Sequence, residues 1–219
     1  FDFSGYSDMA IGMALMMGIR LPFNFNAPYR AVSVRDFWRR WHMTLSRFLR
    51  DYIYIPLGGN RCAPLRQVAN VMVTMGLAGL WHGAGWTFVL WGLLHGAALA
   101  VAHVWTRTGR VMPRWGGRVL TMGFVLLTWV VFRAADLPTA GRMLAGIGGA
   151  QGIGAASVRH PVVLGLALLV ALVGPSSQEV VLERMRPAPW LAVAGGVAFV
   201  LLLFLMGGRP PEPFIYFQF

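Results

Sequence analysis

Apolar residues run along this chain in long stretches whose lengths and breaks predict helices in a membrane. Between Arg66 and Arg107 there are 40 residues without a single Asp, Glu, Lys or Arg. As one helix this stretch would be about 60 Å long, twice the thickness of the hydrocarbon layer. Gly83 and Gly85 interrupt it near its middle. The pattern therefore predicts a hairpin of two helices, 67–80 and 86–105, within a unit 67–105.

Further apolar runs at 119–132, 161–173 and 190–206 predict more membrane helices within 119–206, and a Met-rich run predicts an opening helix at 8–19. The first two of these runs are short for a full crossing, so they are expected to be tilted, extended past their ends or partly re-entrant. The segment 133–160 is predicted to be a loop, and its small-residue stretch 141–154 to be either loop or a close-packed helix.

The region 20–66 has a different character, because it holds nine of the 19 arginines and only two acids. Ser33 followed by Asp36 matches a capping box and predicts a helix start. The arginines that follow lie off a stripe of apolar residues. At 100° per residue, five apolar residues fall within about 80° of one another: Phe37, Trp41, Leu45, Phe48 and Tyr52. The pattern predicts one amphipathic helix over 34–52, lying in the membrane interface.

Composition supports a membrane protein and excludes an ordinary soluble domain. Hydrophobic residues make up 57% of the chain and charged residues only 12%, against roughly 25% charged in typical globular chains. The formal charge is +11, and every basic residue is an arginine. These arginines flank apolar runs and do not form one basic face, which favours a lipid bilayer as the partner over nucleic acid.

The distribution of arginines also predicts orientation. The segments 20–66 and 107–118 are both basic without matching acids, so both are expected in the cytoplasm, with the hairpin between them crossing an even number of times. The loop 133–160 and the tail 207–219 are then expected outside. Because the chain begins at Phe1 inside an apolar pattern, we interpret it as the C-terminal part of a longer protein.

His82 is the main candidate for chemistry, because it lies between two apolar runs and beside two glycines. A titratable group at membrane depth is costly and is a functional candidate by default. The glycines are expected to open space beside the imidazole for a substrate. The alternative is a neutral histidine that bonds a backbone carbonyl at the helix break. For His95 and His103, in the second helix, a structural or tunnel-lining role is favoured, since no acid lies nearby.

His42 and four arginines of the basic region are the next candidates. His42 is expected at the polar edge of the amphipathic helix, either as an interfacial histidine or as part of a site. The arginines either contact lipid headgroups or hold the phosphates of an anionic donor, because guanidinium groups pair phosphate bidentately: Arg39, Arg40, Arg47 and Arg50. The single cysteine, Cys62, excludes a disulfide within the chain and a cysteine-based metal cluster, and no metal site is predicted.

Four ordered motifs resemble the membrane-bound O-acyltransferase family, and within it the branch of bacterial alginate O-acetyltransferases. They are FDFSGYSD at 1–8, DFWRRWHMTLS at 36–46, RDYIYIPLGG at 50–59 and GLWHG at 79–83. The match is specific over residues 1–96. Beyond residue 105 it rests on hydropathy and on the ending PFIYFQF.

The resemblance implies an all-α, multi-pass bundle of transmembrane and slanted interfacial helices around a tunnel. It also implies a bacterial inner-membrane enzyme that moves an acyl group, expected to be acetyl, from a cytoplasmic thioester such as acetyl-CoA to a hydroxyl, without a tightly bound cofactor. In this branch the group crosses to a periplasmic or membrane-anchored partner that modifies an exported polysaccharide, as in alginate biosynthesis. The family histidine inside the tunnel matches His82, and the second motif histidine matches His42.

The residues themselves favour His82 as a general base on the attacking hydroxyl, with an acyl-imidazole as the second choice. Tyr216 is a candidate acyl relay, because a proline-rich spacer carries this phenol to the aromatic end of the chain; the alternative is an aromatic anchor. Two other functions remain open. A transporter or channel subunit would use His82 in a proton relay, although the apolar runs lack the expected carboxylates. A non-catalytic scaffold would only dock a periplasmic transferase.

Overall fold

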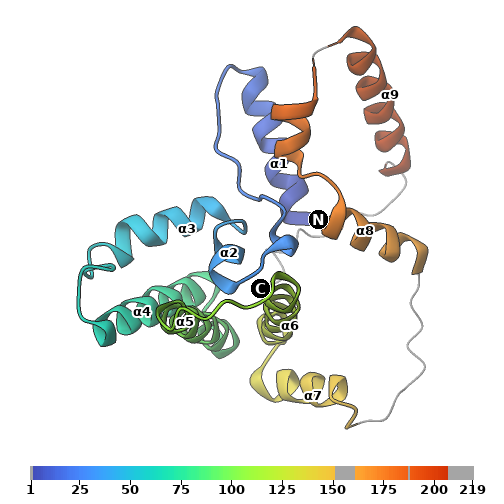
Figure 1. Cartoon of the computed structure of the whole chain (residues 1–219). Helices are drawn as coiled ribbons and strands as arrows, with labels where there is room; N and C mark the ends of the chain where they lie inside the picture. Colours follow the sequence, from blue (N-terminus) through green and yellow to red (C-terminus); the bar gives the residue numbers. More distant parts are fainter. Residues whose placement is uncertain (1, 151–160, 187, 207–219) are drawn as a thin grey trace. The chain divides into compact units, whose positions relative to one another are not determined.

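The computed structural model describes residues 2–150, 161–186 and 188–206, and every regular element in these ranges is helical. Figure 1 shows the helices in chain order. The α-helices are α1 (Asp2–Met16), α2 (Val34–Trp38), α3 (Met43–Leu49), α4 (Pro64–His82), α5 (Trp86–Arg107), α6 (Arg114–Arg133), α7 (Leu137–Ile147), α8 (Pro161–Val173) and α9 (Pro189–Met206). Short elements of other pitch are the 3₁₀ turn η1 (Pro28–Arg30) and the π-helical turns η2 (Arg50–Tyr54) and η3 (Glu179–Arg184).

The chain divides into two compact units. One combines Phe1–Leu21 with Pro175–Phe219 and contains α1, η3 and α9. The other, Pro22–Gly174, contains α2 to α8 together with every histidine and arginine of the candidate site.

The predicted hairpin is confirmed as α4 and α5, which lie side by side (Figure 1). Their backbones approach closely because glycines face each other across the contact. A Cβ on Gly92 would lie 2.2 Å from the carbonyl oxygen of Met75, and a Cβ on Gly79 would lie 2.2 Å from that of Phe88. Small residues of this kind are what allow membrane helices to pack without intervening side chains.

The core of the second unit lies where α2, α3 and α6 meet this hairpin. Helix α6 also packs against the segment before α2, where Gly117 leaves no room for a Cβ beside the Val32 carbonyl. The buried cluster contains Ala31, Phe37, Trp38, Leu45, Leu49, Met75, Ala78, Trp91 and Val125. Aromatic side chains supply much of its area, as the abundance of tryptophan and phenylalanine in the sequence leads one to expect.

The single amphipathic helix predicted over 34–52 is wrong in its middle. Helix α2 starts as predicted, since the Ser33 hydroxyl accepts a hydrogen bond from the Asp36 backbone N–H at 3.1 Å. It ends after Trp38, and α3 begins only at Met43. His42, just before α3, has φ 44° and ψ 54°, a left-handed conformation that ends any right-handed helix. The predicted stripe is consequently split: Phe37 and Leu45 are buried, whereas Phe48 and Tyr52 are exposed.

Two other predictions of helix and loop are corrected. The opening helix spans Asp2–Met16, earlier than the predicted 8–19, because Gly18 at φ 76° closes it. The N–H groups of Gly18 and Ile19 bond the carbonyls of Leu15 and Ala14, the pattern of a Schellman cap. The predicted loop 133–160 contains α7, whose N-cap Asp136 accepts a hydrogen bond from the Thr139 N–H at 2.7 Å.

Two helices, α5 and α6, are long and apolar enough to cross a membrane, and α8 and α9 are shorter apolar helices. Helix α4 is less apolar because it buries polar side chains toward its partners, namely Gln67, Asn70 and Thr74. These groups are hydrogen-bonded: Asn70 donates to the Leu57 carbonyl at 3.0 Å, and the Thr74 hydroxyl donates to the Asn70 carbonyl at 2.7 Å. The predicted helical class is thus confirmed, while the number of crossings and the tunnel stay predictions.

Candidate active site

His82 is the last residue of α4, and it lies half-buried in a cage of aromatic rings. Its ring centroid lies 4.9 Å from that of Trp81, 5.2 Å from that of Trp91 on α5 and 5.1 Å from that of Phe132 on α6. All three rings meet the imidazole edge to face. Three helices therefore fix the position of this side chain by packing.

The glycines after His82 lie close to the side chain of Phe88 on α5. A Cβ on Gly83 would lie 2.6 Å from the ring of Phe88, which also lies close to Gly85. Gly83 has φ 161°, an extended conformation that any residue adopts, so its requirement for glycine comes from the phenylalanine ring. The glycines thus allow α5 to turn back tightly over the end of α4, and the expected room for a substrate beside the imidazole stays a prediction.

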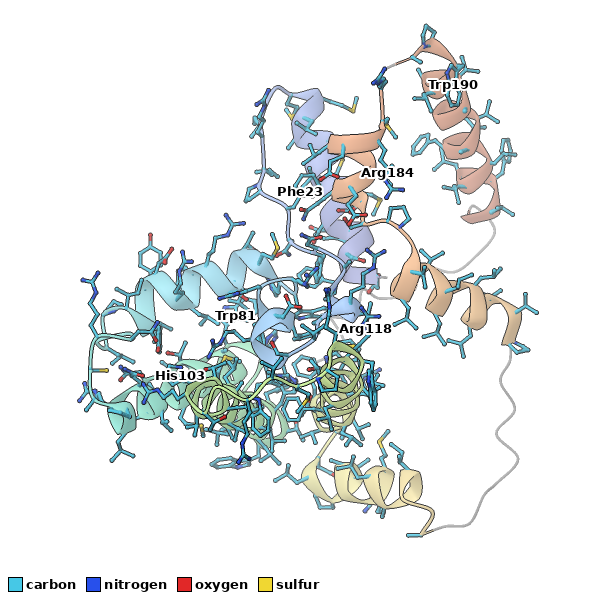
Figure 2. The ribbon with its side chains drawn as sticks, in the orientation of Figure 1. Phe23, Trp81, His103, Arg118, Arg184 and Trp190 are labelled. Carbon is cyan, nitrogen blue, oxygen red and sulfur yellow. The ribbon has the colours of Figure 1, made fainter. Side chains whose placement is uncertain are left out.

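His42 lies next to the same aromatic cage, although it is 40 positions away in sequence. Its ring centroid is 6.3 Å from that of Trp81, so Trp81 contacts both imidazoles (Figure 2 labels this tryptophan). The two histidines are close enough to interact electrostatically. His42 is 9% exposed rather than at the polar edge of a helix. Burial lowers its pKa to about 4, so its imidazole is neutral at neutral pH.

His95 is fully buried in the core, with both ring nitrogens bonded. The indole N–H of Trp38 donates to Nδ1 at 3.2 Å, and Nε2 lies 3.0 Å from the Thr128 hydroxyl. Because that hydroxyl donates its own proton to the Val125 carbonyl at 2.9 Å, Nε2 must be the protonated nitrogen of His95. The ring therefore connects α2, α5 and α6 as a structural element.

His103 belongs to a polar network near the end of α5, away from the turn that follows Trp81 and His82. Its Nε2 lies 2.7 Å from Oε1 of Gln67, which also accepts from Arg107 at 2.8 Å. The Gln67 amide donates to the carbonyls of Asn60 and Cys62. These bonds join the helix ends to the loop before α4, which agrees with the structural role favoured for His103.

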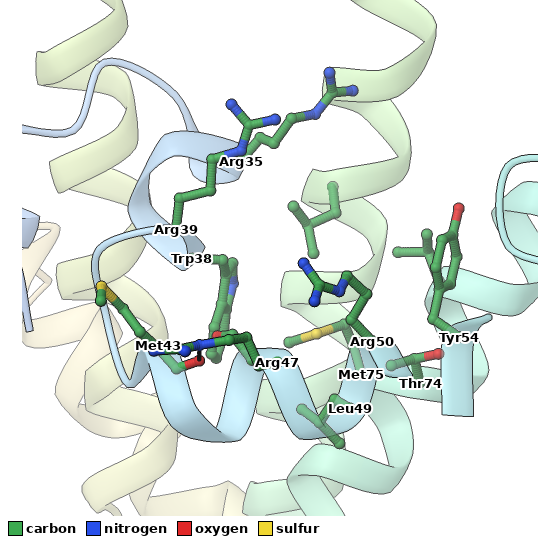
Figure 3. Close-up of a pocket in the computed structure, with 13 residues that line it drawn as sticks. Arg35, Trp38, Arg39, Met43, Arg47, Leu49, Arg50, Tyr54, Thr74 and Met75 are labelled. Carbon is green, nitrogen blue, oxygen red and sulfur yellow. Dashed lines mark hydrogen bonds between the residues drawn. The ribbon is translucent and has the colours of Figure 1, made fainter. Parts of the chain in front are cut away.

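An arginine-lined cavity of about 500 Å³ opens between α2, α3, η2 and the hairpin. Figure 3 shows Arg35 and Arg39 on one side, and Arg47 and Arg50 on the side of α3 and η2. Apolar and small polar residues form the rest of the wall: Trp38, Met43, Ser46, Leu49, Tyr54, Val71, Thr74, Met75 and Leu99. A cavity with several guanidinium groups above an apolar floor suits a phosphorylated molecule with an extended organic arm.

The structure places three of the four predicted donor-binding arginines at the cavity and one away from it. Arg39, Arg47 and Arg50 line the cavity, and Arg35 joins them. Arg40 does not line it: its Nε is 2.8 Å from Oδ1 of Asp36, one helical turn earlier. Arg50 is bonded to Asp51 at 2.7 Å, and this hydrogen bond lowers the pKa of the Asp51 carboxyl. Arg39 and Arg47 are therefore the arginines best suited to test for anion binding.

Two tryptophans that pack against each other link the wall of the cavity to the aromatic cage. Trp38 lines the cavity, its ring centroid is 5.9 Å from that of Trp91, and Trp91 packs against His82. Within the described ranges no three His, Cys, Asp or Glu side chains gather as a metal ion would require. The predicted relay residue Tyr216 lies outside the described residues.

Sequence reasoning missed three residues that build the site. Trp81 and Trp91 stand one and nine positions from His82. Large aromatic residues so close to the helix break were the signal in the sequence that could have indicated an aromatic surrounding for His82. Asn24 precedes the predicted helix by a whole segment, and nothing local marks it as a partner of His42. It bonds that imidazole at 3.1 Å, a contact that only the fold creates.

Comparison with known proteins identifies the class to which this fold and site belong. The model of the membrane-bound O-acyltransferase family (MBOAT) matches residues 1–135, a range that includes His42, His82 and the arginine-lined cavity. The chain therefore belongs to this family.

Particular relatives share the matching region. The chain is 51% identical over 157 residues to a peptidoglycan O-acetyltransferase of Helicobacter pylori, covering 70% of this chain and 30% of that protein. It is 50% identical over 147 residues to a probable alginate O-acetylase AlgI of Pseudomonas aeruginosa (65% and 28%). It is 32% identical over 149 residues to a teichoic acid D-alanyltransferase of Bacillus subtilis (60% and 37%). The matched part of the chain thus spans 28–37% of the length of these relatives.

Proposed function

We propose that this chain carries the catalytic part of a membrane O-acyltransferase, which moves an acyl group, expected to be acetyl, from a cytoplasmic thioester to a hydroxyl acceptor. The observation that carries the proposal is the aromatic cage that holds His82, with neutral His42 against the same indole. Family membership and relatives described as O-acetylating enzymes support it.

In the proposed reaction His82 acts as the general base. It takes the proton of the acceptor hydroxyl while the oxygen forms a bond to the thioester carbonyl carbon. The tetrahedral intermediate then expels the thiolate, which leaves as a thiol with the proton from His82. Such general-base assistance is worth roughly 10²–10⁴-fold, and the surrounding rings protect the thioester from water.

The donor is proposed to bind in the arginine-lined cavity. Its phosphates would contact Arg39 and Arg47, and its thioester arm would follow the apolar wall toward Trp38. Because Trp38 packs against Trp91, which contacts His82, this wall leads in the direction of the base. A free donor such as acetyl-CoA requires no tightly bound cofactor.

The acceptor side is proposed from the relatives. The whole protein would lie in a bacterial inner membrane as a multi-pass enzyme and pass acetyl groups to an exported polysaccharide. A periplasmic or membrane-anchored acetyltransferase would complete the transfer. The apolar helices α5 and α6 and the relatives described as a peptidoglycan O-acetyltransferase and a probable alginate O-acetylase support this assignment.

The test uses membranes that contain the full-length protein. Acetyl-CoA labelled in the acetyl group is added, and both free thiol and label in polymer are measured. We expect release of thiol together with labelled polymer when the partner is present. Thiol release equal to that of membranes lacking the protein would overturn the proposal.

The arginine cavity gives a prediction about donor binding. Arg39→Gln and Arg47→Gln should each raise the apparent KM for acetyl-CoA roughly tenfold, with kcat changed much less, because a charge-assisted phosphate contact is worth about 1.5–3 kcal/mol. Arg142→Gln on α7 is the matched control, since Arg142 bonds Thr139 and does not line the cavity. Unchanged KM in both cavity variants would assign these arginines to lipid headgroups.

Tyr216 remains the proposed relay of the acyl group to the outer partner. Tyr216→Phe keeps the aromatic ring and removes only the hydroxyl, so it separates a relay from an anchor. A relay predicts at least a tenfold loss of polymer acetylation, because the phenol oxygen would itself carry the acetyl group. Acetylation at the wild-type level would establish the aromatic anchor, and Tyr216→Ala would then show whether the ring is needed.

A further inference from the structure

Asn24 makes an unusual set of contacts at the start of α3. Its side-chain Oδ1 lies 3.1 Å from Nδ1 of His42, 3.2 Å from the backbone N of Thr44 and 2.9 Å from the Thr44 hydroxyl. Its backbone carbonyl accepts from the N–H of Met43 at 2.9 Å. A residue 20 positions upstream thus binds the first two N–H groups of α3, which the side chain of the N-cap residue His42 does not.

These contacts hold His42 in a conformation that it would not adopt alone. A non-glycine residue in the left-handed region costs of order 1 kcal/mol or more and persists only where neighbours impose it. Within the described ranges, His42 and Ala27 are the non-glycine residues with positive φ. The three bonds from Asn24 to Met43 and Thr44 supply this constraint, and they aim the imidazole at Trp81.

The same contacts determine which nitrogen of His42 carries its proton. The backbone N–H of Thr44 can only donate, so the Asn24 atom that it contacts must be the amide oxygen. An amide oxygen can only accept, and His42 Nδ1 must therefore be the donor in their 3.1 Å bond. In a neutral ring with a proton on Nδ1, the basic lone pair is on Nε2.

We propose that Asn24 is a positioning residue of the transfer reaction: it fixes His42 as the Nδ1-protonated tautomer and so keeps Nε2 as a proton acceptor beside His82. This inference rests on the proposed function for its catalytic meaning, but the tautomer itself is a property of the resting protein. His42 would then accept a hydrogen bond from a reacting hydroxyl or hand a proton onward at the cage.

Few ionisable groups face His42, so the residue at position 24 has a direct influence on its pKa. The titratable group that faces His42 from α4 is His82. On the side of α2, the nearby charges Arg40 and Asp36 are bonded to each other at 2.8 Å. The segment Pro22 to Ala27, which carries Asn24, has no ionisable side chain. Burial keeps the pKa of His42 near 4, so a carboxylate at position 24 would be a new and direct influence on it.

The test compares the full-length protein with Asn24→Asp, a substitution of equal size. A carboxylate still accepts the bonds from Thr44 and His42, so the start of α3 is preserved. An opposite charge at hydrogen-bond distance raises the pKa of an imidazole by roughly one to three units, which would bring that of His42 to between about 5 and 7. Asn60→Asp is the control, because Asn60 bonds the Tyr54 hydroxyl in an exposed turn.

The first measurement is ¹⁵N NMR of histidine-labelled protein, with His42 assigned by its absence in His42→Gln. We expect a protonated Nδ1 and an unprotonated Nε2 from pH 5 to 8 in the wild type, and a doubly protonated ring at pH 5 in Asn24→Asp. The second is the pH profile of acetyl transfer. Asn24→Asp should be about tenfold less active than the wild type at pH 5 and nearly equal at pH 8, a pattern that a purely structural defect does not produce.

Two results would overturn the inference. One is an Nε2-protonated His42 in the wild type, and the other is an Asn24→Asp variant whose His42 titration and pH profile match those of Asn60→Asp. The NMR measurement does not require turnover. A protein with the expected tautomer but no acetyl transfer would therefore refute the proposed function and leave the assignment of the tautomer standing.

Discussion

Replacing His82 with alanine or glutamine should lower acetyl transfer at least 100-fold while leaving the protein folded. The loss follows from removal of the proposed general base, whose contribution is of order 10²–10⁴-fold. The fold should survive because His82 is half-buried at the end of a helix and meets its neighbours through ring contacts. Transfer is measured in membranes of equal protein content, and folding by the melting temperature in detergent.

The matched control is His103→Gln on the same hairpin. His103 is also a half-buried histidine, but it lies in the polar network at the other end and bonds Gln67. We expect activity within about twofold of the wild type there. Transfer by His82→Ala at the wild-type rate would refute the role of His82, and a folding defect equal in size to the loss of activity would make its role structural.

The hairpin that carries His82 was predictable because local rules decide it. An uncharged stretch twice too long for one crossing must break, and glycines mark where. The start of α2 was predictable for the same reason, since Ser33 satisfies the N–H of Asp36 within one turn. Both features depend on residues that are neighbours in sequence.

The break between α2 and α3 was not predictable, because a distant residue causes it. The apolar spacing of Phe37, Leu45 and Phe48 fits a continuous helix, and the local pattern favours one. Asn24 instead binds the N–H groups that would have bonded within that helix. The resulting turn buries His42 beside Trp81, which brings the two histidines of the site together.

The arginines show the same division between pattern and fold. Their density in 20–66 predicted anion binding of some kind, and the structure arranges three of the four candidates around one cavity. The apolar stripe alone does not separate Arg40 from Arg39, since both lie off it. The difference arises because Arg40 stands four residues after Asp36 on the same helical face, where an ion pair forms.

Replacing His95 with alanine should have the opposite signature to His82→Ala, namely a large loss of stability. His95 is fully buried and bonds Trp38 and Thr128. Its removal leaves the Trp38 indole N–H without an acceptor in the core and opens a cavity between three helices. Together these effects cost about 3–5 kcal/mol. Reversible unfolding in mixed micelles measures this loss, and the activity of the folded fraction should keep the wild-type KM for the donor.

Thr128→Val tests whether the hydrogen bonds of His95 or only its volume matter. The valine keeps the shape of the threonine and removes the hydroxyl that accepts from Nε2, so we expect a loss of about 1–3 kcal/mol, the cost of an unsatisfied buried donor. The double variant His95→Ala/Thr128→Val should lose less stability than the sum of the losses in the two single variants, because the two residues share one hydrogen bond. Full additivity would show that His95 stabilises the core by packing alone. A His95→Ala variant as stable as the wild type would show that His95 does not stabilise the core.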